Sequence, residues 1–251
     1  SLTDITLPEG ITTIKQSLFV QCTSLESITI PSSLTSIEAY AFQNCTSLNN
    51  VIVPIGVTSI DKYAFSKCSS LTDITLPDGL TSFEEGLLWQ STSLESVQIP
   101  DSVTTIGYGA FAECSGLTTL TIPDSVTSIE GSAFWACSSM QDLTIGSGVT
   151  SIGENAFLNC TGEVTINSKI IEIDYSYDEV APFYNSGFTK IILGNDITKI
   201  GSHALAGCAN LQEMTIDENI TSIGYSAFED CTGELTINSK VLETDNYADY
   251  S

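Results

Sequence analysis

The sequence has 251 residues and is strongly acidic, because 31 Asp and Glu residues outnumber 7 lysines and no arginine is present, for a formal net charge of −24. Such a surface repels polyanions, so nucleic acids and anionic lipids are poor partners. No stretch reaches the roughly 18–20 consecutive apolar residues that span a bilayer, and the first residues lack a basic and apolar leader pattern. Composition therefore predicts no direct membrane insertion by these residues.

A single spacing runs through the chain. Cysteine, or serine in its place, recurs every 23 residues at 22, 45, 68, 91, 114, 137 and 160, and the column resumes at 186, 208 and 231. Eight of the ten phenylalanines lie three residues before this column. A fixed period of this length predicts a solenoid, in which each coil buries its apolar side against the next one. We expect residues 1–251 to form a single solenoid of about ten such coils, with an insertion loop at 174–180.

Each repeat begins with a short strand. In residues 71–76 the last apolar side chains are two apart, which is the period of a strand with one buried face. Such strands are expected to stack as a parallel sheet, about 4.8 Å apart, with an outward ladder of polar residues between the apolar ones. The residues in this ladder position are Thr6, Thr29, Thr75, Gln98, Thr121, Thr144, Thr165 and Thr215.

A turn and a second strand follow. Proline occupies the turn in the first six repeats, from Pro8 to Pro123, and it marks the end of pairing because it has no N–H to donate. Residues 126–129, Val-Thr-Ser-Ile, are typical of a second short strand, and the Ala-Phe-x-x-Cys segment after it is long enough for one helical turn. The sequence thus predicts a β-rich coil with stacked parallel strands and short helical turns.

The consensus LxxIxIPxxVTxIxxxAFxxC, which covers essentially the whole chain, resembles the BspA-like class of leucine-rich repeats. This resemblance implies a right-handed leucine-rich-repeat superhelix of the α/β class. It also implies an extracellular or cell-surface protein, of the kind that adheres to host matrix or to other cells.

Neither the cysteines nor the one histidine form a recognisable catalytic or metal site. Neighbouring coils place Cys45 near both Cys22 and Cys68, and serine replaces cysteine twice, so we interpret the column as free, buried thiols. No Cys-x-x-Cys pair is present, and His203 has no partner group that other repeats lack. We therefore predict no enzyme activity, no cofactor and no metal site.

Acidic residues also align in two columns. Stacked like charges repel, and calcium could relieve that repulsion, but we favour a solvated face that keeps an extended repeat protein in solution. The two columns contain Asp4, Asp73, Asp142 and Glu213, and Glu38, Asp61, Glu84 and Glu130.

Both tryptophans lie in one column, directly after the phenylalanine position. Trp89 and Trp135 are two coils apart with Ala112 between them, and Tyr184 follows in the same column. At about 4.8 Å per coil the indoles would stand roughly 10 Å apart, and small Ala112 would leave a slot. Such a slot could clamp a sugar ring or an apolar side chain of a partner. The alternative is that both rings merely cover the turn segment.

The insertion supplies a second candidate surface. It contains Tyr175 and Tyr177 among short polar residues and is echoed at 245–250, after segments 162–169 and 233–240 that also match. Tyrosine with short polar residues suits adaptable recognition. A tolerated insertion explains the pattern as well.

These observations predict a non-catalytic recognition and adhesion scaffold that binds a protein or glycan partner. One alternative is a structural spacer that holds another domain away from the cell, which the regular coils of residues 1–160 suit. Another is a binding module appended to an enzyme. The divergent coils of residues 161–251 favour binding.

Overall fold

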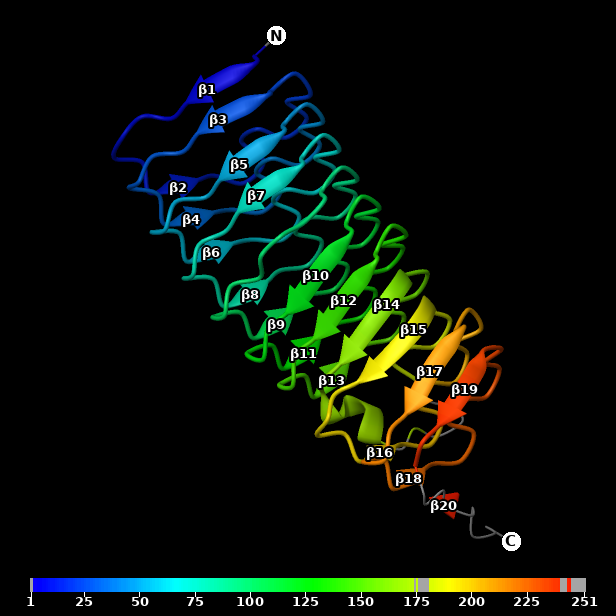
Figure 1. Ribbon diagram of the computed structural model, residues 1–251. Helices are drawn as coiled ribbons and strands as arrows, with labels where there is room; N and C mark the ends of the chain where they lie inside the picture. The colour runs from blue at the N-terminus through cyan, green and yellow to red at the C-terminus, as the bar shows by residue number, and fades with distance from the viewer. Residues whose placement is uncertain (1, 174, 176–180, 240–242, 245–251) are drawn as a thin grey trace, which may run out of the picture.

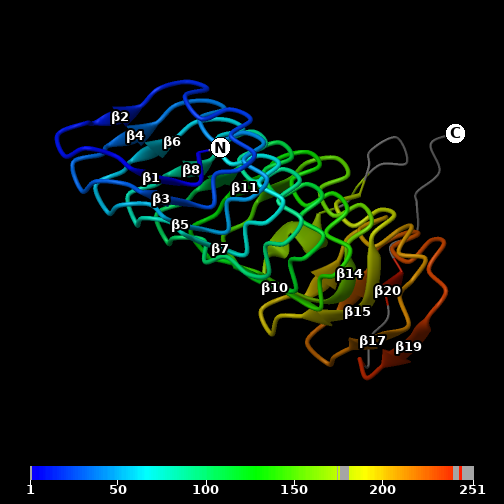
Figure 2. The same cartoon turned by 90° about the horizontal axis from the view of Figure 1, so that it is seen from above.

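The computed structural model describes residues 2–173, 175, 181–239 and 243–244. Within these ranges the chain winds into a solenoid, and each regular coil supplies a first strand, a turn, a second strand and a turn segment (Figure 1). The view from above shows the same coils as one elongated stack that runs from β1 to β19 (Figure 2). The repeat solenoid predicted from the 23-residue period is confirmed.

The first strands form one row of parallel strands. Thr119 faces Asp142 and Ile122 faces Ile145 between β10 and β12, and along β10 exposed and buried side chains alternate. This alternation puts the apolar residues inside and the threonines outside. The first strands are β1 (Asp4–Thr6), β3 (Ser27–Thr29), β5 (Asn50–Ile52), β7 (Asp73–Thr75), β10 (Thr119–Ile122), β12 (Asp142–Ile145), β14 (Thr161–Ile166), β15 (Gly187–Leu193), β17 (Glu213–Ile216) and β19 (Glu234–Ile237).

The second strands form another parallel row. Each has two residues. The second residue is an isoleucine in eight of these strands, Phe83 in β8 and Thr244 in β20. These strands are β2 (Thr13–Ile14), β4 (Ser36–Ile37), β6 (Ser59–Ile60), β8 (Ser82–Phe83), β9 (Thr105–Ile106), β11 (Ser128–Ile129), β13 (Ser151–Ile152), β16 (Lys199–Ile200), β18 (Ser222–Ile223) and β20 (Glu243–Thr244).

The row of first strands is interrupted near its middle. Residues 96–99 form no strand, and a single bridge joins Ser96 to Thr119 of β10. A hollow of about 270 Å³ opens between this segment and β7, and one of about 420 Å³ opens between it and β10. From β10 onward the first strands form a continuous six-stranded sheet that ends at β19.

The turn segment, between the second strand and the cysteine column, pairs through its backbone. The N–H of Phe19 donates to Ala41 of the next coil (2.8 Å), whereas the N–H of Val20 donates back to Ser17 of its own coil (3.1 Å). Ser17 and Gln21 adopt left-handed backbone, with φ of 57° and 61°. Such residues interrupt a helix, so the short helical turns predicted for this segment form as tight turns instead. The one helix in the described ranges is the 3₁₀ helix η1 (Lys169–Glu172).

A column of phenylalanine rings runs through the core. The rings of Phe111 and Phe134 are 5.1 Å apart and those of Phe134 and Phe157 are 5.4 Å apart, stacked at interplanar angles of 8° and 2°. Burial of each large apolar side chain stabilises the fold by roughly 1.5–3 kcal/mol. The stacked rings therefore join neighbouring coils in addition to the hydrogen bonds of the backbone ladders.

Leu88 interrupts this stack in the fourth coil. In the same coil Phe83 occupies the position that Ile60 and Ile106 hold in the coils on either side, and its ring lies 5.4 Å from that of Phe111. Leu88 and Phe83 are both fully buried. Phe83, in the isoleucine column, thus supplies the aromatic ring that Leu88 lacks in the phenylalanine column.

All eight cysteines are free, as predicted, and the buried ones form hydrogen bonds between coils. The thiol of Cys114 donates to the carbonyl of Leu88 in the preceding coil, with a sulfur–oxygen distance of 3.2 Å. Ser91 uses its hydroxyl in the same way, donating to the carbonyl of Phe65 at 3.0 Å. This common donor role explains the exchange of cysteine and serine. Burial raises the pKa of the Cys45 thiol to about 12, so the group stays protonated.

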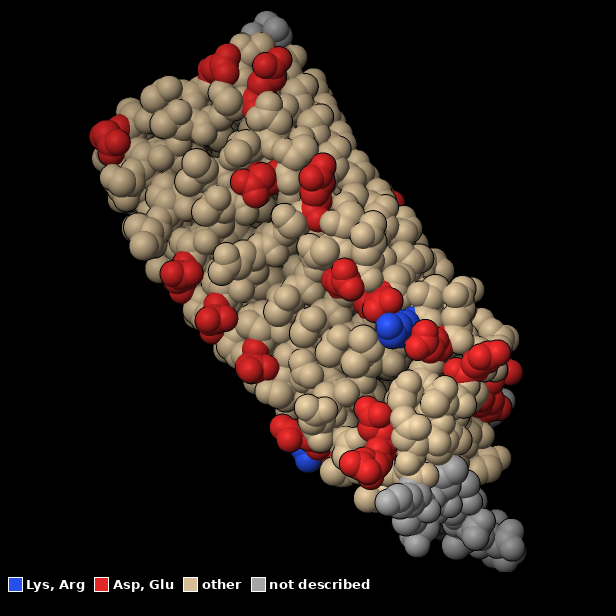
Figure 3. Space-filling view, in the orientation of Figure 1, with Lys and Arg blue, Asp and Glu red and all other residues tan. Residues whose placement is uncertain are grey.

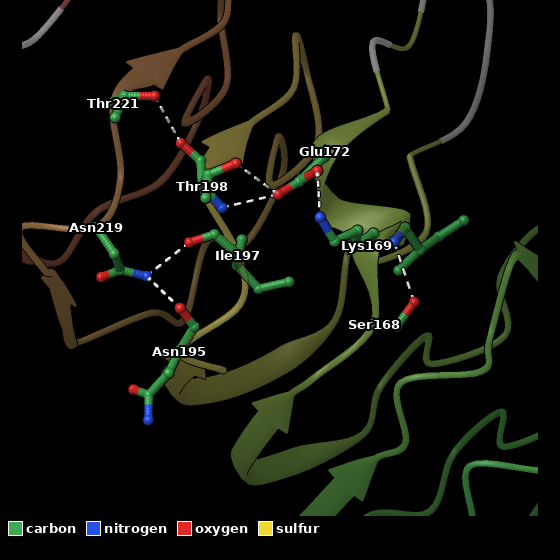
Figure 4. A network of polar contacts seen from close by, with 9 residues as sticks. Ser168, Lys169, Glu172, Asn195, Ile197, Thr198, Asn219 and Thr221 are labelled. Atoms are coloured by element: carbon green, nitrogen blue, oxygen red, sulfur yellow. Dashed lines mark hydrogen bonds and ion pairs between the residues drawn. The ribbon is translucent and has the colours of Figure 1, made fainter.

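A polar network fixes the irregular coil that follows β14 (Figure 4). The hydroxyl of Ser168 caps η1 at its start. At its end Glu172 accepts hydrogen bonds from the backbone N–H and the hydroxyl of Thr198, at 2.7 and 3.2 Å, and lies 3.7 Å from Lys169 Nζ. In the next coil the amide of Asn219 donates to two main-chain carbonyls. The stacking of coils therefore continues across the insertion.

Candidate functional site

A hollow of about 170 Å³ lies on the turn segments of four consecutive coils, and we call it the aromatic hollow. Both tryptophans of the chain line it, with Ala112 between them in the same column, which is the arrangement that the 23-residue spacing predicts. The complete lining is Tyr63, Gly86, Trp89, Tyr108, Gly109, Ala112, Ser132 and Trp135.

Two glycines create the space. Tyr63, Gly86, Gly109 and Ser132 occupy equivalent positions in successive coils, and all four have left-handed backbone, with φ of 56°, 61°, 60° and 54°. The ring of Tyr63 leans over Gly86, where an added Cβ would stand only 2.1 Å from the ring. Glycine at 86 therefore allows this position of the tyrosine ring, and glycine at 109 leaves the adjoining space open.

Tyr63 forms one wall, and several contacts hold it. Its ring stacks on Tyr40 at 5.4 Å and meets the edge of Trp89 at 6.1 Å, and its hydroxyl donates to Glu85 at 2.8 Å. Burial, together with the hydrogen bond to Glu85, raises the pKa of Tyr63 to about 12. The phenol is therefore neutral at ordinary pH, and its hydrogen is engaged by the carboxylate.

Trp89 is fixed on its polar side. Its indole N–H donates to Glu113 at 3.2 Å, and the amide of Gln90 donates to both oxygens of the same carboxylate at 3.0 Å. The ammonium group of Lys67 lies 4.8 Å from the centre of the Trp89 ring, and Lys67 does not line the hollow. The Glu113 carboxylate and the Lys67 ammonium group thus hold the Trp89 indole in one orientation.

Tyr108 and Trp135 form the open side of the hollow. Their side chains are 54% and 37% exposed, whereas Ala112 on the floor is only 4% exposed. The backbone N–H of Tyr108 donates to Glu130 at 2.9 Å, which fixes the chain at the base of that ring. Large, partly exposed aromatic side chains around a small recess are typical anchors for a binding partner.

The other candidate contacts do not join the aromatic hollow. Tyr184 is 42% exposed and packs over Gly207, in a later coil. Tyr175 is half-buried against the core, where its backbone N–H donates to Ser202 (2.9 Å). Tyr177 lies outside the described residues.

Sequence reasoning missed Tyr63 and Tyr108. The signal that could have revealed them is the replacement of larger residues by Gly86 and Gly109 in a single column.

The acidic columns have local partners. Glu38 accepts from Lys15 and from the backbone N–H of Gln16, both at 2.8 Å, and chiefly the hydrogen bond from Lys15 lowers the pKa of this carboxyl. Glu163, which faces Asp142 of the first column, lies 3.6 Å from Lys190. In the described part of the chain, no three or more His, Cys, Asp and Glu side chains gather as a possible metal site.

The histidine has a local role. His203 is only 7% exposed, its Nδ1 lies 3.3 Å from Glu229, and its ring meets the edge of Tyr225. These contacts give it a packing role in the turn segment.

The family profile described as a BspA type Leucine rich repeat region matches residues 1–92, 87–177 and 179–250. The chain belongs to the BspA-type leucine-rich repeat family. BspA-type repeats are scaffolds that are generally non-catalytic, and they account for the strands, the phenylalanine column and the cysteine column. The aromatic side chains of the hollow occupy positions that the repeat consensus leaves open.

Two solved structures are similar to this chain. A leucine-rich repeat protein from Bacteroides ovatus is 23% identical, with 96% of this chain and 74% of that one covered and a TM-score of 0.56. A leucine rich cell surface protein from Faecalibacterium prausnitzii is 29% identical, with 98% and 74% covered and a TM-score of 0.49. The first of these supports the shared fold. A comparison with curated proteins gives no significant match. Among the described BspA-type coils, no helix has the length and apolar character to cross a membrane.

Proposed function

We propose that this chain is a non-catalytic recognition scaffold at the cell surface or outside the cell, and that the aromatic hollow is its contact with a protein or glycan partner. The observation that carries the proposal is the gathering of Tyr63, Trp89, Tyr108 and Trp135 around one recess, two of them exposed. Tryptophan and tyrosine in a recess are enriched among residues that dominate binding energy. The external location rests on membership of the BspA-type family.

A structural spacer is the competing function, and the hollow supports recognition over it. A spacer needs only a stable stack of coils, and the phenylalanine and cysteine columns provide that without exposed rings. Tyr63 and Trp89 contact neighbouring coils, whereas the rings of Tyr108 and Trp135 leave much of their surface exposed. Their presence on one face favours recognition over spacing.

The test uses one substitution that fills the hollow and one matched control. Ala112→Leu places a larger side chain on the floor, and Leu158 shows that the same column accepts leucine. Ala206→Leu makes the same change in the same column, at a position that does not line the hollow. Equal thermal unfolding of both variants would show that neither change damages the stack.

Binding is measured against immobilised extracellular matrix proteins, whole cells and a glycan array. We expect a partner that binds the unaltered chain and Ala206→Leu alike, and Ala112→Leu at least about tenfold more weakly, since filling a central recess removes its anchor contact. Trp135→Ala should weaken binding in the same direction. Binding that is unchanged by both hollow variants would contradict the proposed contact, and an absence of binding across all three panels would favour the spacer.

A further inference from the structure

We infer that the aromatic hollow takes the cationic end of a lysine or arginine side chain from a basic protein partner. The inference rests on the proposed function and narrows its ligand from protein or glycan to one chemical group. Three observations carry it: the chemistry of the lining, the contact already made by Lys67, and the distribution of charge along the chain.

The lining offers ring surfaces and few hydrogen-bonding groups. The hydroxyl of Tyr63 and the indole N–H of Trp89 are already engaged by Glu85 and Glu113. The floor consists of two glycines and an alanine, and the remaining side-chain polar groups of the lining are the hydroxyls of Ser132 and Tyr108 and the indole N–H of Trp135. A sugar would bring many hydroxyl groups to this surface, and most of them would lose hydrogen bonds to water without gaining hydrogen bonds to the protein. A cation would bind here more favourably than a sugar, because the faces of aromatic rings attract positive charge.

One of these rings already binds a cation. Lys67 of the same chain places its ammonium group 4.8 Å from the centre of the Trp89 ring, within the distance at which cation–π attraction operates. Lys67 is not among the residues that line the hollow, so its ammonium group does not fill the recess. Tyr63, Tyr108 and Trp135 add three further rings around the same recess.

The surrounding charge favours a basic partner. Between Lys67 and Lys169 the sequence contains twelve acidic residues and no lysine, arginine or histidine, and most of the hollow falls within this stretch. Glu113 and Glu130 accept hydrogen bonds from the Trp89 indole and the Tyr108 backbone, whereas Glu85, which accepts from Tyr63, also lies 4.0 Å from Lys62. Acidic residues also far outnumber basic ones on the strand face (Figure 3). This field attracts cationic partners at a distance and opposes anionic ones.

Trp89 and Trp135 make a direct test possible. They are the only tryptophans of the chain and both line the hollow, so the two indole N–H signals in an NMR spectrum of the ¹⁵N-labelled chain report on this site alone. The probes are the amides of Nα-acetyl-lysine and Nα-acetyl-arginine. The neutral comparison is the lysine probe with its side chain acetylated, and glucose and galactose represent sugars.

We expect saturable shifts of both indole signals with the two cationic probes, and binding at least about tenfold weaker for the neutral probe. A rise in salt from about 50 to about 500 mM should weaken the cationic probes further, because it screens the acidic field. Ala112→Leu should abolish the shifts and Ala206→Leu should keep them.

Equal shifts with the neutral probe would overturn the inference in favour of an apolar side chain, and shifts with the sugars alone would overturn it in favour of a glycan. If the cationic probes leave the indoles unmoved while a panel partner still depends on Ala112, the inference fails and the proposed function stands. If the cationic probes leave the indoles unmoved and the panel partner binds Ala112→Leu as it binds the unaltered chain, the inference and the proposed function both fail.

Discussion

The exchange between Phe83 and Leu88 makes a quantitative prediction about the core. Both side chains are fully buried, and Phe83 supplies the ring that contacts Phe111 where the phenylalanine stack lacks a member. Phe83→Ile alone should leave a cavity and cost about 1–2 kcal/mol of unfolding free energy. Leu88→Phe alone should overpack the same coil and cost about 1–3 kcal/mol.

Together the two changes give the fourth coil the residues that its neighbours have in both columns. The double variant should lose about 1 kcal/mol or less, so the coupling between the two sites should be about 2 kcal/mol and stabilising. Urea unfolding of the four proteins, followed by circular dichroism, measures each term, provided that the slopes of the transitions agree. If the double variant loses the sum of the two single losses in unfolding free energy, the argument that the Phe83 ring replaces a ring at position 88 is refuted.

Three further predictions concern polar groups and protonation. Cys114→Ser keeps a donor to the carbonyl of Leu88 and should change the unfolding free energy by less than about 1 kcal/mol, whereas Cys114→Val removes that hydrogen bond and should cost about 1 kcal/mol more than serine in the same urea experiment. Burial raises the pKa of Cys45 to about 12, so the unfolded chain loses this proton first as pH rises. Stability should therefore be complete below about pH 9 and then fall by about 1 kcal/mol per pH unit for each such thiol. Because burial also raises the pKa of Cys68 and Cys114, the urea midpoint of Cys45→Ser should still fall between about pH 8 and about pH 10.5, but less steeply than that of the unaltered chain; equal slopes would contradict the share assigned to Cys45. Glu172→Ala removes two hydrogen bonds to Thr198 and should cost about 1–3 kcal/mol, with faster amide hydrogen exchange at Thr198; unchanged exchange there would contradict the anchoring role.

The period of the sequence was sufficient to predict the stacked strands, the inward columns and the free thiols. Each of these depends on a spacing that recurs, and a recurring spacing identifies which residues meet across coils. The donor role of the cysteines was less accessible, because it depends on the distance from Cys114 to the Leu88 carbonyl rather than on residue type. Serine in the same column was the only trace of it.

The turn segment shows where the sequence was insufficient. The segment is long enough for one helical turn and in most coils begins with alanine or leucine, which are strong helix formers, yet Ser17 and Gln21 take left-handed backbone because hydrogen bonds to the next coil fix them there. Local propensity loses to pairing between coils at these positions. The tryptophan pair was predictable from one column. Tyr63 and Tyr108 were not, since they reach the hollow from two other columns over glycines.

The backbone pairing of the turn segment has a consequence for how new binding surfaces could arise. N–H and carbonyl groups there join coil to coil regardless of the side chain, so positions such as those of Ala206 and Tyr184 can change while the stack persists. A pocket resembling the aromatic hollow could therefore be transplanted along the solenoid by exchanging a few residues in adjacent coils. Repeats of this kind would let selection, or an engineer, assemble a row of independent recognition pockets on one rigid frame.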